Sequence, residues 1–123
     1  FNIALCFFYN FIMHVFFGNV AAAYIGWAQS PFQAEVGFAS LGMSIAGFLT
    51  YRSYYKMRLI AIIPPAVFLW GASAGHLYQM IVSDNFSPGN AGFVFWWDIF
   101  MPIILLILLK FSKDFELSCA KGN

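Results

Sequence analysis

Long hydrophobic runs separated by short polar segments divide the chain into four parts. A helix that crosses about 30 Å of hydrocarbon needs roughly 20 mostly apolar residues. Four stretches of the sequence meet this requirement: residues 1–23, 32–51, 58–82 and 91–110. The connections between them are short, so we expect consecutive helices to be antiparallel neighbours. The pattern predicts a single all-α domain over residues 1–123, a polytopic membrane protein built as an antiparallel four-transmembrane-helix bundle.

The polar segments before the second and fourth helices have the residue order of helix starts. Ser30 is suited to cap a helix, Pro31 is suited to its first position, and Gln33, three residues after Ser30, completes a capping box. Ser87 and Pro88 repeat the Ser-Pro order before the fourth helix. We therefore expect both segments to cap the helix that follows them.

The composition requires a bilayer as solvent. Of the 123 residues, 62% are hydrophobic and only 9% are charged, whereas soluble proteins carry about 25% charged residues. So few charges are too few to cover a globular core with polar surface. The sequence also lacks a run of Lys and Arg of the kind that binds nucleic acid. The lipid bilayer is therefore the expected partner, and nucleic acid is not.

The six basic residues all fall in segments that four membrane crossings place on the same side of the membrane. They fall in the second connection or after the fourth span: Arg52, Lys56, Arg58, Lys110, Lys113 and Lys121. The positive-inside rule then predicts that both termini are cytoplasmic. No disulfide is expected between Cys6 and Cys119, because neither meets an oxidising environment there. Because the first residue is Phe1 and not Met, we also expect a segment before it to be missing.

Each predicted helix contains one titratable residue in the half of the membrane away from the basic residues. These four are His14, Glu35, His76 and Asp98. Charged groups within a span are energetically costly and usually face a bundle interior or an aqueous cavity. We therefore expect Glu35 to face the bundle interior. At least one histidine should lie within hydrogen-bond reach of Glu35 or Asp98, directly or through one water.

Neighbouring positions support an interior location for this cluster. Asn10 stacks with His14 at helical spacing, and Ser73 and Gln79 share a face with His76. The second helix has two stripes of small residues on opposite sides, one of Glu35, Ala39, Gly42 and Ala46 and the other of Gly37, Ser40, Ser44 and Gly47. Small residues let membrane helices approach closely. We therefore expect close packing at Gly42, and likewise at Gly75 of the third helix.

Two histidines and two carboxylates are compatible with several kinds of chemistry. The four side chains could ligate a metal, or His14 and His76 could be axial ligands of a haem. They could also form a hydrogen-bonded proton relay without a ligand, or a quinone-linked relay, or simply hold the bundle together. Trp96 and Trp97 beside Asp98 could wall a flat cofactor, although contact with lipid is the simpler interpretation. The sequence contains no nucleophile–base motif, phosphate-binding loop or Cys-pair metal motif, so an independent enzyme is not expected.

Three strings carry a resemblance to a known family. They are Ile25–Gly42 (IGWAQSPFQAEVGFASLG), Gly71–Ile81 (GASAGHLYQMI) and Ser87–Gly92 (SPGNAG). With the Asp and Pro of the last helix, they resemble an uncharacterised prokaryotic family of small four-helix membrane proteins, and the four-span layout is more loosely similar to DoxX-like membrane proteins. The resemblance implies a four-helix fold and a prokaryotic cytoplasmic membrane, and it implies no reaction.

Two functions remain open at this point. The first is an accessory or structural subunit of a larger membrane assembly, in contact with other subunits or with further copies of itself. The alternative is a redox or proton-transfer protein that binds a metal, haem or quinone at the His/carboxylate cluster.

Overall fold

The computed structural model describes the backbone of residues 1–121 and the side chains of residues 1–113. The described residues form helices without any β-strand, so the all-α prediction is confirmed. The helices are α1 (Asn2–Phe16), α2 (Gly18–Ile25), α3 (Phe32–Thr50), α4 (Tyr55–Ser83), α5 (Pro88–Ala91) and α6 (Phe93–Lys121).

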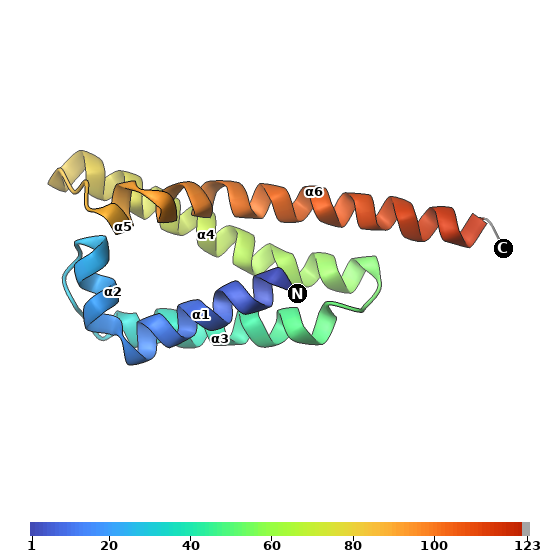
Figure 1. Cartoon of the computed structure of the whole chain (residues 1–123), viewed down its shortest axis with the longest axis horizontal. Helices are drawn as coiled ribbons and strands as arrows, with labels where there is room; N and C mark the ends of the chain where they lie inside the picture. The colour runs from blue at the N-terminus through green and yellow to red at the C-terminus, as the bar shows by residue number, and fades with distance from the viewer. Residues whose placement is uncertain (122–123) are drawn as a thin grey trace.

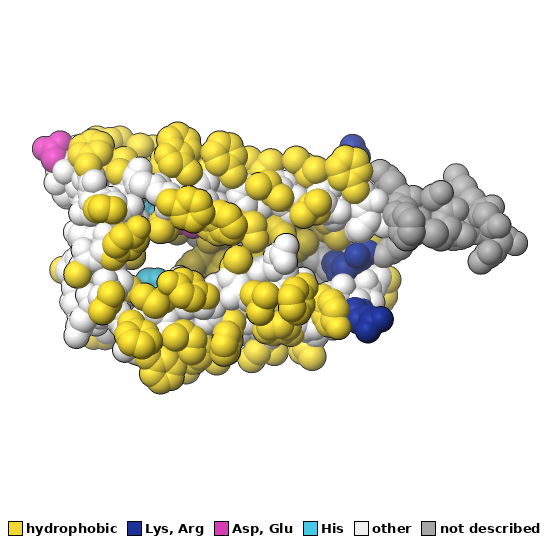
Figure 2. All heavy atoms as spheres, viewed as in Figure 1, with side chains coloured by type: hydrophobic (Ala, Val, Ile, Leu, Met, Phe, Trp, Pro, Cys, Tyr) yellow, Lys and Arg dark blue, Asp and Glu magenta, His cyan; other side chains and the backbone are white. Residues whose placement is uncertain are grey.

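The long helices are arranged as two pairs (Figure 1). Helix α1 lies along α3, and α4 lies along α6. The pairs approach each other from the α3–α4 connection to about the middle of α4, where the rings of Phe7 and Phe68 meet edge to face with centroids 5.7 Å apart. At the other end the pairs separate, and the short helices α2 and α5 bridge them. The result is a bundle that is closed at one end and hollow toward the other, as Figure 2 shows.

Three helical segments are long and apolar enough to cross a membrane: Phe32–Thr50, Tyr55–Ser83 and Pro88–Lys113. Helices α1 and α2 qualify only together, and they are bent by 102° relative to each other. The prediction of one continuous helix over residues 1–23 is therefore wrong. The helix breaks at Phe17, next to Gly18, which is a weak helix former. A Cβ on Gly18 would lie 2.9 Å from Gln29 Nε2, so the chain turns where its backbone packs closely against Gln29.

One of the two small-residue stripes on α3 packs against α1. Its residues Gly37, Ser40, Ser44 and Gly47 are all buried. Ser40 Oγ accepts a hydrogen bond from Asn10 Nδ2 at 2.8 Å, and Ser44 Oγ donates to the Ala4 carbonyl at 2.7 Å. Small residues here let the two backbones approach and exchange hydrogen bonds, as expected for packing in lipid.

The opposite stripe of α3 is left open, which corrects the expectation of close packing at Gly42. A Cβ at Gly42 would meet nothing within 4 Å, and one at Gly75 would make only an ordinary contact with Trp27 at 3.6 Å. The expectation of close approach was wrong at Gly42 because α3 packs on α1 through its other face, and wrong at Gly75 because its neighbour is the Trp27 side chain at ordinary contact distance and not a helix backbone. Glu35, Ala39 and Gly42 are exposed on this open face.

The predicted capping box at Ser30 does not form. Helix α3 has no side-chain cap, and the Gln33 N–H donates to the Ser30 carbonyl at 3.1 Å. The Gln33 side chain is instead hydrogen-bonded to His14 of α1. Ser87 and Pro88 do begin a helix, but it is the four-residue α5, and Gly92 separates it from α6.

Charged side chains gather at opposite ends of the molecule (Figure 2). The described Lys and Arg side chains lie at the end that contains the α3–α4 connection, and Asp84 lies at the end with α5. The side chains of Lys121 and Cys119 are outside the described residues.

Candidate functional site

A buried hydrogen-bond network is centred on Asn90 of α5, which is 0% exposed. Its Oδ1 accepts a hydrogen bond from Trp27 Nε1 at 2.9 Å and lies 2.8 Å from His76 Nδ1. Its Nδ2 donates to the carbonyls of His76, at 3.1 Å, and of Asn85, at 2.8 Å. One amide side chain thus joins the α2–α3 connection, helix α4 and the α4–α5 connection.

The amide of Asn90 determines the tautomer of His76. Because both Nδ2 hydrogens go to carbonyl oxygens, Oδ1 is the acceptor, and His76 Nδ1 must carry the hydrogen. His76 Nε2 is then the atom that faces Asp98, at 3.7 Å from Oδ2. His76 is 4% exposed and Asp98 is 5% exposed, so the pair is shielded from solvent. The arrangement places one ring nitrogen and one carboxyl group side by side in a buried site, at a separation longer than a direct hydrogen bond.

Asn85 holds the backbone beside this network. Its Nδ2 donates to the carbonyls of Ile25, at 3.1 Å, and Gly26, at 3.2 Å, and its Oδ1 accepts from the Ser87 N–H at 3.1 Å. Gly26 ends α2 with φ = 77°, a left-handed conformation that glycine adopts without strain. A Cβ at Gly26 would also collide with Ser87 Oγ. The end of α2 is therefore tied directly to the segment that carries Asn90.

The structure brings two of the four predicted cluster residues together and separates the other two from them. His76 and Asp98 form the pair described above. His14 is hydrogen-bonded to Gln33 between α1 and α3. In the part of the chain that the structure describes, no three His, Cys, Asp or Glu side chains come close enough to hold a metal ion. The four-ligand metal set considered from the sequence is therefore not assembled.

Glu35 does not face the bundle interior, contrary to our expectation. It lies in the first turn of α3 and is exposed. The reason is the face through which α3 packs, since the stripe containing Gly37 is turned toward α1 and Glu35 lies on the other side. A carboxylate in the first turn also interacts favourably with the positive end of the helix dipole.

The remaining predicted residues have mainly local roles. Asn10 bonds to Ser40, and Ser73 Oγ donates to the Trp70 carbonyl at 2.9 Å within α4. No side-chain hydrogen bond of Gln79 occurs among the described residues. Trp96 and Trp97 are 54% and 40% exposed, so they turn outward and do not wall the His76–Asp98 pair.

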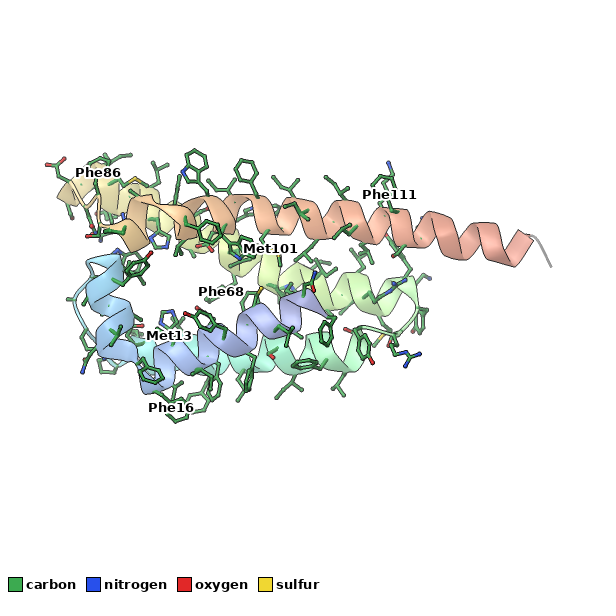
Figure 3. The ribbon with its side chains drawn as sticks, viewed as in Figure 1. Met13, Phe16, Phe68, Phe86, Met101 and Phe111 are labelled. Carbon is green, nitrogen blue, oxygen red and sulfur yellow. The ribbon has the colours of Figure 1, made fainter. Side chains whose placement is uncertain are left out.

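The space between the two helix pairs has apolar walls. Met13 of α1, Phe68 of α4 and Met101 of α6 point toward it (Figure 3). Histidine side chains are visible in the hollow in Figure 2. The polar network thus lies at the wide end of the molecule, next to apolar side chains that offer no strong hydrogen-bonding group.

Sequence reasoning missed the residues that organise the network. Trp27, Asn85 and Asn90 all lie in the connections between the predicted helices. The available signal was an asparagine placed between Gly89 and an apolar helix, since an amide in so hydrophobic a chain needs partners. For the His14–Gln33 contact the sequence held no comparable signal.

The chain belongs to a family of unknown function (DUF6790), whose model matches residues 1–117. The resemblance to an uncharacterised family is thereby confirmed, while the looser similarity to DoxX-like proteins stays a prediction. No curated protein and no solved structure matches the chain.

Proposed function

We propose that this member of the unknown-function family is an integral membrane protein that serves as an accessory or structural subunit of a larger membrane assembly. The observation that carries the proposal is the open face of α3, where Gly42 has free space beside it. Helices in lipid associate through small residues, because lipid tails are as apolar as the helices themselves. An exposed stripe of Ala39, Gly42 and Glu35 suits the close approach of a further helix, from another subunit or a second copy.

We also infer the orientation of this subunit in a prokaryotic cytoplasmic membrane. The end that carries the described Lys and Arg side chains would be cytoplasmic, together with both termini, and Asp84 would be outside. Support comes from the separation of the charges, since Lys and Arg are enriched on the cytoplasmic side of membrane proteins.

Gly42→Leu tests the subunit proposal. The variant should fold normally, because a side chain at Gly42 enters open space, but it should block a helix from docking there. We expect recovery of co-purifying membrane proteins, or of a second tagged copy, to fall about tenfold or more, which corresponds to a loss of at least about 1.4 kcal/mol of association free energy. Tm in detergent should stay unchanged.

Gly71→Leu is the matched control. Gly71 also has open space around it, but it lies on α4. The control should keep its partners. If Gly42→Leu also keeps every partner, the open face of α3 is not an interface and the proposal fails.

Proton exchange at the His76–Asp98 pair is a second candidate function, favoured by one observation. The Asn90 contact directs His76 Nε2 toward Asp98 in a buried site, so a proton on either group faces the other. Infrared difference spectra between two pH values should then contain a carboxylic acid C=O band that Asp98→Asn lacks and Glu35→Gln retains. Identical spectra for the parent and Asp98→Asn would show that the pair is purely structural.

A further inference from the structure

The bend between α1 and α2 contains a cavity of about 610 Å³. It lies at the end of the molecule away from the described Lys and Arg side chains (Figures 1 and 2). Its wall comes from the end of α1, the start of α2 and the segment that leads into α3, within residues 14–20 and 29–34. The cavity is therefore separate from the His76–Asp98 pair. Its size is typical of sites that bind small molecules.

The wall of this cavity is polar but contains no Asp, Glu, Lys or Arg. In a chain that is 62% hydrophobic, it gathers side chains with hydrogen-bonding groups from two separate segments. They are His14, Asn19, Gln29, Ser30 and Gln33. A phosphate or carboxylate would find no Lys or Arg in the wall, and the nearest charged residue along the chain is the carboxylate Glu35. The wall is therefore suited to a neutral polar ligand.

The two glutamines of the wall are oriented so that their N–H groups remain available. Gln33 Oε1 accepts a hydrogen bond from His14 Nδ1, and Gln29 Oε1 accepts one from the Ser30 N–H at 3.2 Å. Neither Nε2 group has a partner among the described residues. A Cβ on Gly18 would lie 2.9 Å from Gln29 Nε2, so this donor lies beside the glycine of the wall. Each amide thus offers two N–H donors to a ligand.

Asn19 and Ser30 add acceptors to these donors. Their side chains form no hydrogen bond with another described residue, and an amide or a hydroxyl can both donate and accept. A ligand hydroxyl also does both, so a ligand with several hydroxyl groups can pair with every group of the wall. An ammonium ligand could only donate, and its hydrogens would oppose those of Gln29 and Gln33.

Aromatic rings form the apolar part of the wall. Phe16 and Phe17 are 65% and 51% exposed, so their rings are accessible. The ring of Phe16 is held edge to face by Phe11, with centroids 5.8 Å apart. A sugar ring has an apolar face of C–H groups as well as hydroxyl groups, and such a face can pack on an aromatic side chain. The wall thus offers both kinds of contact that a sugar needs.

We propose that this cavity binds a neutral hexose unit, either as a free sugar or as the head group of a glycolipid. Gln29 and Gln33 donate hydrogen bonds to the sugar hydroxyls, and Asn19 and Ser30 also accept them. The C–H face of the sugar lies against the aromatic part of the wall. The inference depends neither on the partner proposed for α3 nor on proton exchange at the His76–Asp98 pair.

Equilibrium binding of radiolabelled ligands to the immobilised full chain tests the site. The chain is kept in a polyoxyethylene detergent, because maltoside and glucoside detergents would themselves supply sugar. Monoglucosyl diacylglycerol should bind in a saturable manner, whereas diacylglycerol and glucose 6-phosphate should not. Competition by free glucose would identify a site for the sugar itself, and binding of the glycolipid without such competition would identify a glycolipid site.

Two substitutions in the wall should weaken this binding. Gln29→Ala and Asn19→Ala should each lower the affinity for monoglucosyl diacylglycerol about fivefold, as expected for one or two lost neutral hydrogen bonds. Both residues are exposed, so the fold should be retained. Asn2→Ala is the matched control, because it removes an exposed amide outside this wall and should change the affinity by no more than about twofold.

Several outcomes would overturn the proposal. Equal binding of diacylglycerol would show adhesion of acyl chains without recognition of the sugar, and equal binding of glucose 6-phosphate would show that the wall does not select a neutral ligand. Absence of binding by both glucose and the glycolipid would also exclude the site. Unchanged affinity in Gln29→Ala and Asn19→Ala, or equal weakening by Asn2→Ala, would place the sugar elsewhere. If Gln29→Ala fails to fold, Asn19→Ala decides alone.

Discussion

Asn90→Ala is expected to lower the free energy of unfolding by about 4 kcal/mol, because it leaves several buried polar groups without partners at about 1–3 kcal/mol each. The lost contacts are those of the Trp27 Nε1–H and the His76 Nδ1–H with Asn90 Oδ1. The Asn90 Nδ2 donors to the His76 and Asn85 carbonyls disappear as well. Since Asn90 is 0% exposed, water cannot replace these bonds without rearrangement of the surrounding segments.

Thermal or denaturant unfolding in detergent measures this effect, and Asn19→Ala is its control. Asn19 is exposed in α2, and exposed substitutions of this kind usually change stability by less than about 0.5 kcal/mol. Trp27→Phe, which removes only one donor to Asn90, should fall between the two variants. Equal stability of Asn90→Ala and Asn19→Ala would show that the network contributes nothing to the fold.

Gly37→Leu is expected to prevent stable folding or to lower the free energy of unfolding by about 3 kcal/mol or more, since overpacking of this size forces helices apart. A Cβ at Gly37 would collide with Val15 Cγ2 and contact His14 Cβ at 3.4 Å. Gly47 is similarly close to α1, where an added Cβ would lie 3.0 Å from Ala4 Cβ. Either substitution would separate α3 from α1.

Gly42→Leu provides the matched comparison on the same helix. It adds the same side chain where nothing lies within 4 Å, so expression and Tm should match the parent. The test is a comparison of monodisperse yield and Tm in detergent across Gly37→Leu, Gly47→Leu and Gly42→Leu. Similar Tm values for Gly37→Leu and Gly42→Leu would mean that the faces of α3 are assigned incorrectly.

The hydrophobic pattern was sufficient to predict the all-α class, because the thickness of a bilayer determines how long an apolar run must be. It did not predict the bend at Phe17. Gly18 and Asn19 sit within a predominantly apolar run, so the mean hydropathy of the run hides them. The bend becomes visible only when Gln29 and Gln33 from another part of the chain are packed beside Gly18.

The small-residue stripes of α3 likewise were predictable from the sequence as stripes, but which of them is buried was not. Helical periodicity separates the stripe of Gly37, Ser40, Ser44 and Gly47 from the stripe of Glu35, Ala39 and Gly42. Both are suited to close packing, so only the position of α1 decides which one is buried. Because the stripe of Gly37 is buried against α1, Glu35 on the other stripe is exposed, and the prediction that it faces inward was wrong for this reason.

By itself, the sequence determined the helical class, the hydrophobic segments, the grouping of the cations and the presence of titratable residues within those segments. Each of these properties depends on residues close together in the chain and on the bilayer as solvent. Only the tertiary structure decided that His76 meets Asp98, that His14 meets Gln33, and that Asn90 joins Trp27 to His76. Trp27 and Asn90 are 63 positions apart, and side-chain hydrogen bonds of such separation depend on how whole helices are placed, which a local pattern does not contain.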